Sequence, residues 1–296
     1  MNKPKSVTRR GKPGQNLAGT RIFNTVSYTV LILCCLISLF PIFYAIMGSF
    51  KSNMDFITGV GGVLPASWHP ENYAKAWQNA NFARYTLNSI QVTLCAIVGS
   101  VVLTSMAGYV FARGEFPGKK LIMGMFLSTM FLATGAITIF PIFSLAKTLH
   151  LNTSLSGLTL IYVFTINVAN IYLVMGYVKG LPKELDEAAR IDGCGFFGTF
   201  THVILPLCKP ILATVALLTF KTVWNDYLMP MVFTLSNEDL KTLTVGVVSL
   251  KSSGGGAGAY DMMLAGTAIS LIPMVVFYAF TSKFFVSGIT AGAVKG

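Results

Sequence analysis

The chain has 296 residues, of which 53% are apolar and only 11% are charged. An ordinary soluble domain carries roughly 25% charged residues, and the mean hydropathy of this chain is +0.65. This composition excludes a soluble globular protein and an intrinsically disordered one, and it predicts a polytopic membrane protein. The formal net charge is +11. Because the basic residues lie between apolar runs, we attribute this charge to membrane orientation and not to nucleic-acid binding.

Six apolar stretches are long enough to cross a membrane, which takes about 20 residues. The first of them follows a basic tail at residues 1–21, and it is longer than the apolar region of a cleaved signal peptide. Strands of a membrane β-barrel would be about ten residues long and would alternate strictly. The sequence therefore predicts an all-α membrane bundle with six transmembrane helices, at about 22–48, 85–112, 120–146, 155–178, 208–233 and 260–286.

Lysine and arginine counts orient the predicted bundle. With the N-terminus inside, the inner segments hold 15 of these residues and the outer loops hold 6, while one more lies within a span. Cytoplasmic segments carry the excess of basic residues, so we expect both termini in the cytoplasm. The longer outer connections then fall near 49–84 and 234–259, and the second of these ends in a flexible, glycine-rich stretch.

The inner connection at residues 181–206 differs in composition from the rest of the chain. Residues 183–192 hold six charged side chains, four of them acidic, out of eleven acidic residues in all. Pro182 suits a first helical turn, Glu184 favours a helix N-terminus and Gly193 suits a helix C-cap. We therefore expect a short cytoplasmic helix at about 183–192. Its adjacent alanines would form a low face for another protein, or the helix is merely solvated and has no partner.

The same segment resembles the EAA motif of permease subunits in ATP-binding-cassette (ABC) importers, Glu-Ala-Ala-x3-Gly-x9-Ile-x-Leu-Pro. Val203 stands where the motif usually has isoleucine, and the other positions match. The motif lies between the fourth and fifth predicted spans, on the inside, as the resemblance requires. The resemblance implies that coupling to the ATPase is carried by Glu187, Ala188, Ala189, Asp192, Gly193, Leu205 and Pro206.

Three further stretches, at 112–119, 224–227 and 288–296, resemble the carbohydrate-uptake branch of these permeases, the MalG-like proteins. The similarity covers most of the chain, from about residue 22 to the end. It implies a type I importer permease (MetI-like) fold, with a six-span permease domain at 22–287 and a cytoplasmic tail at 288–296. It also implies a multi-pass protein of the bacterial inner membrane, in contact with membrane lipid.

The resemblance further implies a set of partners. A subunit of this kind pairs with a homologous permease as a heterodimer, sits on two cytoplasmic ATPase subunits and receives a sugar or oligosaccharide from an extracytoplasmic solute-binding protein. The chain has no phosphate-binding loop of the form G-x4-G-K-[ST], so ATP and Mg²⁺ would be bound by the partner ATPase, and this chain would need no cofactor. The three histidines and five cysteines lack ligand spacing, and we expect neither a metal site nor catalytic residues.

Polar residues inside the predicted spans are candidates for a translocation path, because charges within a membrane are costly. Lys221 lies near the middle of the fifth predicted span, with Asn225 and Asp226 about one turn further on. This lysine would face the path, or it would snorkel or pair structurally. Asn167 and Asn170, in the fourth predicted span, would line the same path or form hydrogen bonds between helices.

Two other classes of membrane protein are the alternatives. An ion- or proton-coupled secondary transporter would keep polar or charged groups in several spans, and here only Lys221 and Asp226 offer charges. An integral membrane enzyme would need clustered histidine or carboxylate residues at the membrane face, and no such cluster is found in the sequence. The sequence therefore favours a transport subunit that is not itself an enzyme.

Overall fold

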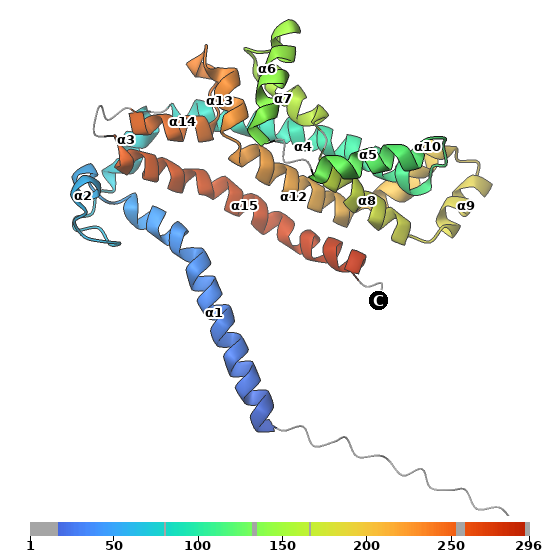
Figure 1. The fold of residues 1–296 in the computed structure, drawn as a ribbon, viewed down its shortest axis with the longest axis horizontal. Helices are drawn as coiled ribbons and strands as arrows, with labels where there is room; N and C mark the ends of the chain where they lie inside the picture. Colours follow the sequence, from blue (N-terminus) through green and yellow to red (C-terminus); the bar gives the residue numbers. More distant parts are fainter. Residues whose placement is uncertain (1–16, 80, 132–134, 166, 253–257, 294–296) are drawn as a thin grey trace, which may run out of the picture.

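The computed structural model describes residues 17–79, 81–131, 135–165, 167–252 and 258–293. Within these ranges every regular element is a helix (Figure 1), in agreement with the predicted all-α class. Three helices are long and apolar enough to cross a membrane: α1 (Leu17–Gly48), α4 (Phe82–Arg113) and α15 (Tyr260–Ala293).

Three bent helix pairs raise the number of spans to as many as six, by length and composition. The first pair is α5 (Lys119–Phe131) with the 3₁₀ helix η1 (Gly135–Thr138) and α6 (Ile139–Thr148). The second is α7 (Leu155–Phe164) with α8 (Val168–Gly180). In the third, the helical stretch 196–207 meets α12 (Lys209–Asn225) at an angle of 79°.

The remaining elements are short and lie in the connections. The stretch before α12 consists of three consecutive pieces, of which the middle one is a π-helix. The bounds are α2 (Asn53–Thr58), α3 (Glu71–Asn79), α9 (Glu184–Ile191), α10 (Phe196–Thr199), the π-helix η2 (Phe200–Ile204), α11 (Leu205–Leu207), α13 (Leu228–Thr234), the 3₁₀ helix η3 (Glu238–Leu240) and α14 (Leu243–Leu250).

Helix α4 is the centre of the bundle. It packs against α7, α8 and α12, while α15 packs against α12 and α14. Helices α4, α12 and α15 run along the length of the bundle (Figure 1). Near its start, Phe82 and Tyr85 join a buried cluster with Trp224. Near its end, Tyr109 joins a second cluster with Val174. Apolar packing thus holds α4 at both ends.

The fifth predicted span, 208–233, is interrupted. Helix α12 ends at Asn225, Asp226 has an extended backbone, and α13 begins at Leu228. Pro230 explains the break, because a helical proline lacks an N–H and clashes with the carbonyl four residues before it, which here belongs to Asp226. The Thr244 hydroxyl donates a hydrogen bond of 2.9 Å to the freed carbonyl of Trp224. The polar residues at 225 and 226 therefore lie at a helix end and not inside a continuous helix.

The connection 234–259, predicted to lie outside, contains a helix that the sequence pattern did not predict. Helix α14 is apolar, and Leu243, Val247 and Leu250 are buried in the cluster that also holds the start of α4. Gly246 lies so close to Tyr85 that an added Cβ would be 2.2 Å from the ring. With eight residues, this helix is too short to be found by a criterion based on membrane thickness.

Most of helix α1 projects away from the bundle (Figure 1), and almost every residue from Phe23 to Tyr44 is exposed. Its C-terminal end packs on the bundle, where Gly48 lies against Leu264 of α15. The helix begins at Leu17, so it includes the end of the predicted basic tail; residues 1–16 lie outside the described residues. At the other end of the chain, α15 continues to Ala293. Most of the predicted tail 288–296 is therefore helical, and residues 294–296 lie outside the described residues.

Candidate coupling helix and polar cavity

Helix α9 forms at the predicted place, with sharp signals at both ends. Three acidic residues occupy its first turn, where they stabilise the positive end of the helix dipole. At its other end Gly193 has φ +84°, and its N–H donates to the carbonyl of Arg190 at 3.0 Å. The next N–H, of Cys194, donates to Ala189 at 2.8 Å. This Schellman pattern favours glycine at position 193, because other side chains are strained at positive φ.

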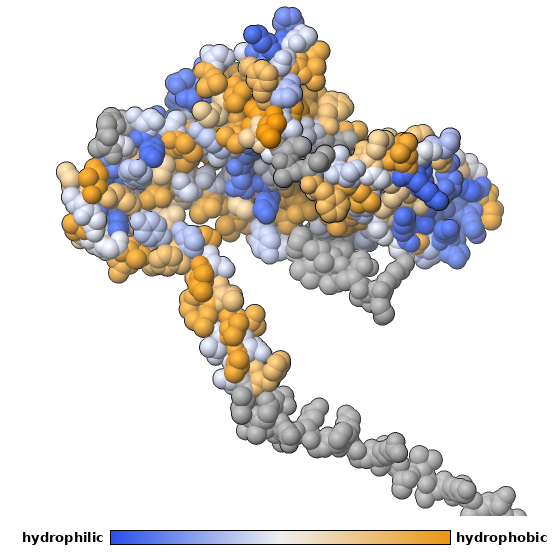
Figure 2. Space-filling view, viewed as in Figure 1, coloured by the Kyte–Doolittle hydropathy of each residue, from blue (hydrophilic) through white to orange (hydrophobic). Residues whose placement is uncertain are grey.

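The outer surface of α9 carries both charge and an apolar residue. Glu187, Ala188 and Asp192 are exposed, and Ile191 is 87% exposed. Ala189, in contrast, is buried against its own chain, so only one of the two alanines is open to a partner. Figure 2 shows the hydrophilic surface gathered over α9 at one end of the bundle.

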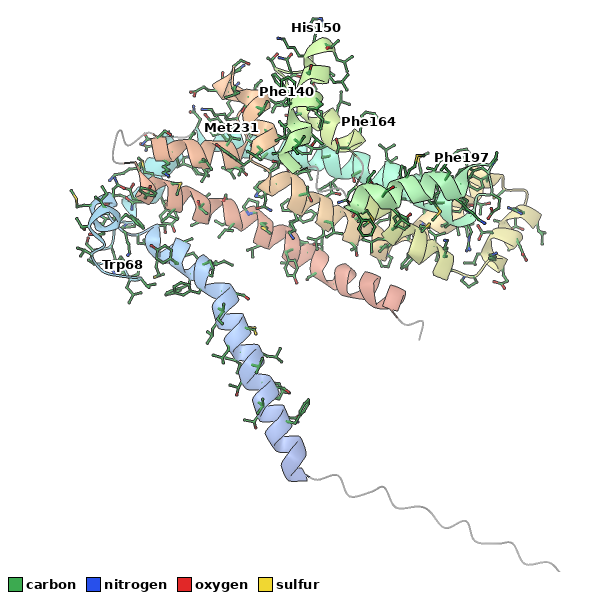
Figure 3. The ribbon with its side chains drawn as sticks, viewed as in Figure 1. Trp68, Phe140, His150, Phe164, Phe197 and Met231 are labelled. Atoms are coloured by element: carbon green, nitrogen blue, oxygen red, sulfur yellow. The ribbon has the colours of Figure 1, made fainter. Side chains whose placement is uncertain are left out.

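The last two EAA positions lie in the bent stretch between α9 and α12. Leu205 is half-buried and packs against the cluster around Tyr109. Pro206 is exposed and lies at the start of the short helix α11, directly after the π-helix η2. Phe197, in α10 of the same stretch, is 65% exposed and lies at this end of the bundle, while Trp68 lies at the opposite end (Figure 3). Of the EAA residues, Ala189 and Leu205 therefore contribute to internal packing, while Glu187, Ala188, Asp192, Gly193 and Pro206 are exposed.

A buried ion pair, which the sequence analysis did not single out, connects α9 to α4. Arg113, the last residue of α4, places its Nε 2.9 Å from Oδ2 of Asp186, and the two side chains are 8% and 14% exposed. The Nη2 of the same arginine donates to the carbonyl of Leu181 at 2.8 Å. Tyr109 places its hydroxyl 3.5 Å from the other oxygen of Asp186. These side chains line a cavity of about 450 Å³ between α4, α9 and α10.

The five residues predicted for the translocation path come together around a second cavity. This hollow, of about 590 Å³, lies between the start of α8 and the end of α12 and is lined by Asn167, Asn170, Lys221, Asn225 and Asp226. An adjoining hollow of about 320 Å³ shares three of them and is also lined by polar side chains of α4, α7 and α12, namely Ser100, Tyr162 and Thr219.

Some of these polar groups already have partners within the chain. Asp226 accepts a hydrogen bond of 2.8 Å from the Tyr162 hydroxyl and a longer one, 3.4 Å, from the N–H of Met229. Asn167 caps α8 by accepting from the N–H of Ala169 at 3.0 Å. Asn225 donates to the carbonyl one turn earlier at 2.8 Å. These contacts explain how polar groups are tolerated within an apolar bundle.

Two of the polar groups have free hydrogen-bonding capacity. Asn170 is only 2% exposed, and its side-chain oxygen makes no hydrogen bond to the described residues. Lys221 is exposed and lines the cavity, and its ammonium makes no ion pair with any side chain that the structure describes. The cavity can therefore bind a solute that carries both hydrogen-bond donors and acceptors.

Residues 100–288 match the family described as "Binding-protein-dependent transport system inner membrane component". The chain belongs to this family. It is 33% identical over 275 residues to the probable ABC transporter permease protein YurM of Bacillus subtilis (strain 168), an alignment that covers 93% of this chain and 90% of that protein. It is 30% identical to the maltodextrin transport system permease protein MdxG of the same organism, over 95% of this chain and all of that protein.

A solved structure supports the same assignment. The permease in the crystal structure of a bacterial ABC transporter involved in the import of the acidic polysaccharide alginate matches with a TM-score of 0.75 and 26% identity. The match covers 93% of this chain and 100% of that one. The arabinooligosaccharides transport system permease protein AraQ of Bacillus subtilis (strain 168) is 31% identical, over 88% of this chain and 92% of its own.

These comparisons confirm the predicted MalG-like resemblance and the type I importer permease fold. The chain is a multi-pass permease subunit of an ABC importer in the inner membrane, and not an enzyme, since ATP hydrolysis in such importers is performed by a separate ATPase. The family also implies a second permease and a solute-binding protein as partners. It favours the importer over the ion-coupled secondary transporter.

Proposed function

We propose that this permease carries a sugar or oligosaccharide into a bacterial cell as one half of a heterodimeric permease. The observation that carries this proposal is the position of two features on one bundle: a polar cavity at mid-length, and the charged helix α9 at one end. The relatives are named for maltodextrin and arabinooligosaccharide transport, which supports the class of solute. Sugar hydroxyls both donate and accept hydrogen bonds, as the free groups of Asn170 and Lys221 require.

The ATPase docks at α9 in this proposal. Its surface would have to offer basic groups to Glu187 and Asp192 and an apolar depression to Ile191, all of which are exposed. Two copies of the ATPase serve the two permeases, and they bind the ATP and Mg²⁺. Both termini of this chain are then cytoplasmic, which the 15-to-6 distribution of basic residues supports.

The solute-binding protein docks at the other end of the bundle. There α2, α3 and α14 surround the starts of α4 and α15 (Figure 1). A solute released at that end reaches Lys221, Asn225 and Asp226 at the broken junction of α12 and α13 before it can pass towards α9. In this proposal the break lets these polar groups line the path, so that no charged residue has to face lipid, which would cost about 2.5–3.5 kcal/mol on insertion scales.

Uptake into vesicles tests this function. The chain would be purified with its partner permease and ATPase, reconstituted into proteoliposomes and supplied with the solute-binding protein and a panel of labelled oligosaccharides. We expect uptake of at least one sugar, and only with ATP on the side of the ATPase. Sugar uptake that continues with an inactivated ATPase and follows an ion gradient would contradict the proposal.

A further inference from the structure

We propose that Arg113 is a positioning residue that transmits the displacement of α9 to α4 through its ion pair with Asp186. This inference rests on the proposed function, because it assumes that the ATPase moves α9. It goes further by naming the contact inside this chain through which the motion would reach the transmembrane bundle. Docking and transmission are then separate steps, carried by different residues.

The geometry ties Arg113 to two parts of the α9 segment at once. Its Nε faces Asp186 in the first turn of α9 at 2.9 Å, and its Nη2 donates to the carbonyls of Leu181 and Pro182, at 2.8 and 3.4 Å, just before the helix. The guanidinium serves both sides in different ways: its Nε forms an ion pair with Asp186 without a hydrogen bond, while its Nη2 donates to the backbone carbonyls. Arg113 therefore fixes the position of α9, and of the two residues just before it, relative to the end of α4.

Burial makes this contact stiffer than an ordinary surface ion pair. The two side chains are 8% and 14% exposed, so solvent and salt screen their attraction less than at the surface. Removing one partner leaves the other charge buried without compensation, which is strongly unfavourable. The other charged residues that line the same cavity, Glu115, Lys183, Glu187 and Arg190, are exposed, and exposed pairs contribute little.

Aromatic packing extends the connection beyond the ion pair. Tyr109, one turn before Arg113, places its ring centroid 4.7 Å from that of Phe196 and 5.1 Å from that of Phe200. α9 itself packs against α10 and η2. The end of α4 is therefore fixed to the whole α9–α10 unit. From there α4 reaches the hollow that adjoins the polar cavity and that Ser100 lines.

The test compares two carboxylates that line the same cavity. Glu115, two residues beyond the end of α4, pairs with Lys119 at 3.2 Å, and its side chain is 88% exposed. The variants are Arg113→Ala, Asp186→Asn and Arg113→Lys, with Glu115→Gln as the matched control. For each complex, two quantities are measured: the amount of ATPase that co-purifies, and the stimulation of ATP hydrolysis by binding protein with sugar.

We expect Arg113→Ala and Asp186→Asn to retain the ATPase but to lose stimulation by about fivefold or more, the lower end of typical coupling between sites. Arg113→Lys should recover part of the stimulation, because it keeps the charge without the fork of N–H donors, and Glu115→Gln should behave as wild type, because its pair is exposed. Asp186→Asn changes no volume, so it keeps the test decisive if Arg113→Ala does not fold.

Stimulation at the wild-type level in the assembled Arg113→Ala and Asp186→Asn complexes would overturn the inference and leave α9 docking untouched. An equal loss in Glu115→Gln would also overturn it, because the effect would then not belong to the buried pair. Failure of the proposed function gives a different result, since the wild-type chain would then retain no ATPase.

Discussion

Replacing Gly108 by alanine should separate α4 from α8. An added Cβ at this position would lie 2.6 Å from Cγ1 of Val174 and 2.7 Å from its Cβ. It would also lie 3.1 Å from the backbone nitrogen of Met175. A side chain can rotate away from such a contact, but the Cβ of Val174 and the backbone cannot. The two helices must therefore move apart along the line of contact.

Two opposing effects set the magnitude. Glycine to alanine inside a helix is favourable by about 1 kcal/mol, because glycine loses more backbone entropy on folding. Overpacking in a closely packed interior costs about 1–3 kcal/mol. Gly176, on α8 itself, has open space where a Cβ would stand, so Gly176→Ala retains only the favourable part. The two variants should differ by about 1–3 kcal/mol, with Gly108→Ala the less stable.

The measurement is the free energy of unfolding of each variant in mixed detergent micelles, compared with wild type. Gly176→Ala is the matched control, because it makes the same chemical change in the same helix pair. If Gly108→Ala proved as stable as Gly176→Ala, the close approach of α4 and α8 would be refuted, and with it the central place of α4 in the fold.

Two further substitutions address the polar cavity. Lys221→Met should lower sugar uptake while membrane insertion stays the same or improves, because it removes a costly charge from within the bundle; uptake at the normal rate would show that Lys221 does not act on the solute. Tyr162→Phe should lower the free energy of unfolding by about 1.5–3 kcal/mol, since it removes a hydrogen bond to the charged Asp226. Tyr172→Phe, which removes a neutral hydrogen bond to the carbonyl of Met123, should cost only about 0.5–1.5 kcal/mol. Equal losses would mean that Asp226 does not depend on Tyr162.

Local signals explain which parts of the site could be predicted from the sequence. Pro182, Glu184 and Gly193 lie within twelve residues of one another and each has a known preference at a helix end, so the bounds of α9 followed directly. The polar residues of the cavity were found because each is costly in an apolar span. That Asn170 and Lys221 share one cavity depends on the packing of α8 beside α12, which no local pattern shows.

Three features could not be predicted from the sequence: the break after α12, the short helix α14 and the ion pair of Arg113. The first two were hidden by the length expected of a membrane span, and the third joins residues that are far apart in the sequence. The stretch 208–233 is apolar enough to be taken as one span. The break at Asp226 could be predicted only if Pro230 was interpreted as ending a helix, whereas prolines are also common inside membrane helices. Helix α14 is shorter than any span. Arg113 was counted only for membrane orientation, because Asp186 follows it after 73 residues and their contact arises only when α4 and α9 meet.

The docking of α9 on the ATPase is the central claim, and co-purification followed by an ATPase assay tests it most directly. The variants are Glu187→Ala and Gly193→Val, with Gly195→Val as the control. Both glycines have open space for a side chain, but only Gly193 has a positive φ, which costs a residue with a Cβ about 1–2 kcal/mol. We predict that Glu187→Ala and Gly193→Val lose the ATPase or its stimulation by binding protein and sugar, while Gly195→Val keeps both. Normal assembly and normal stimulated hydrolysis in both Glu187→Ala and Gly193→Val would contradict the claim.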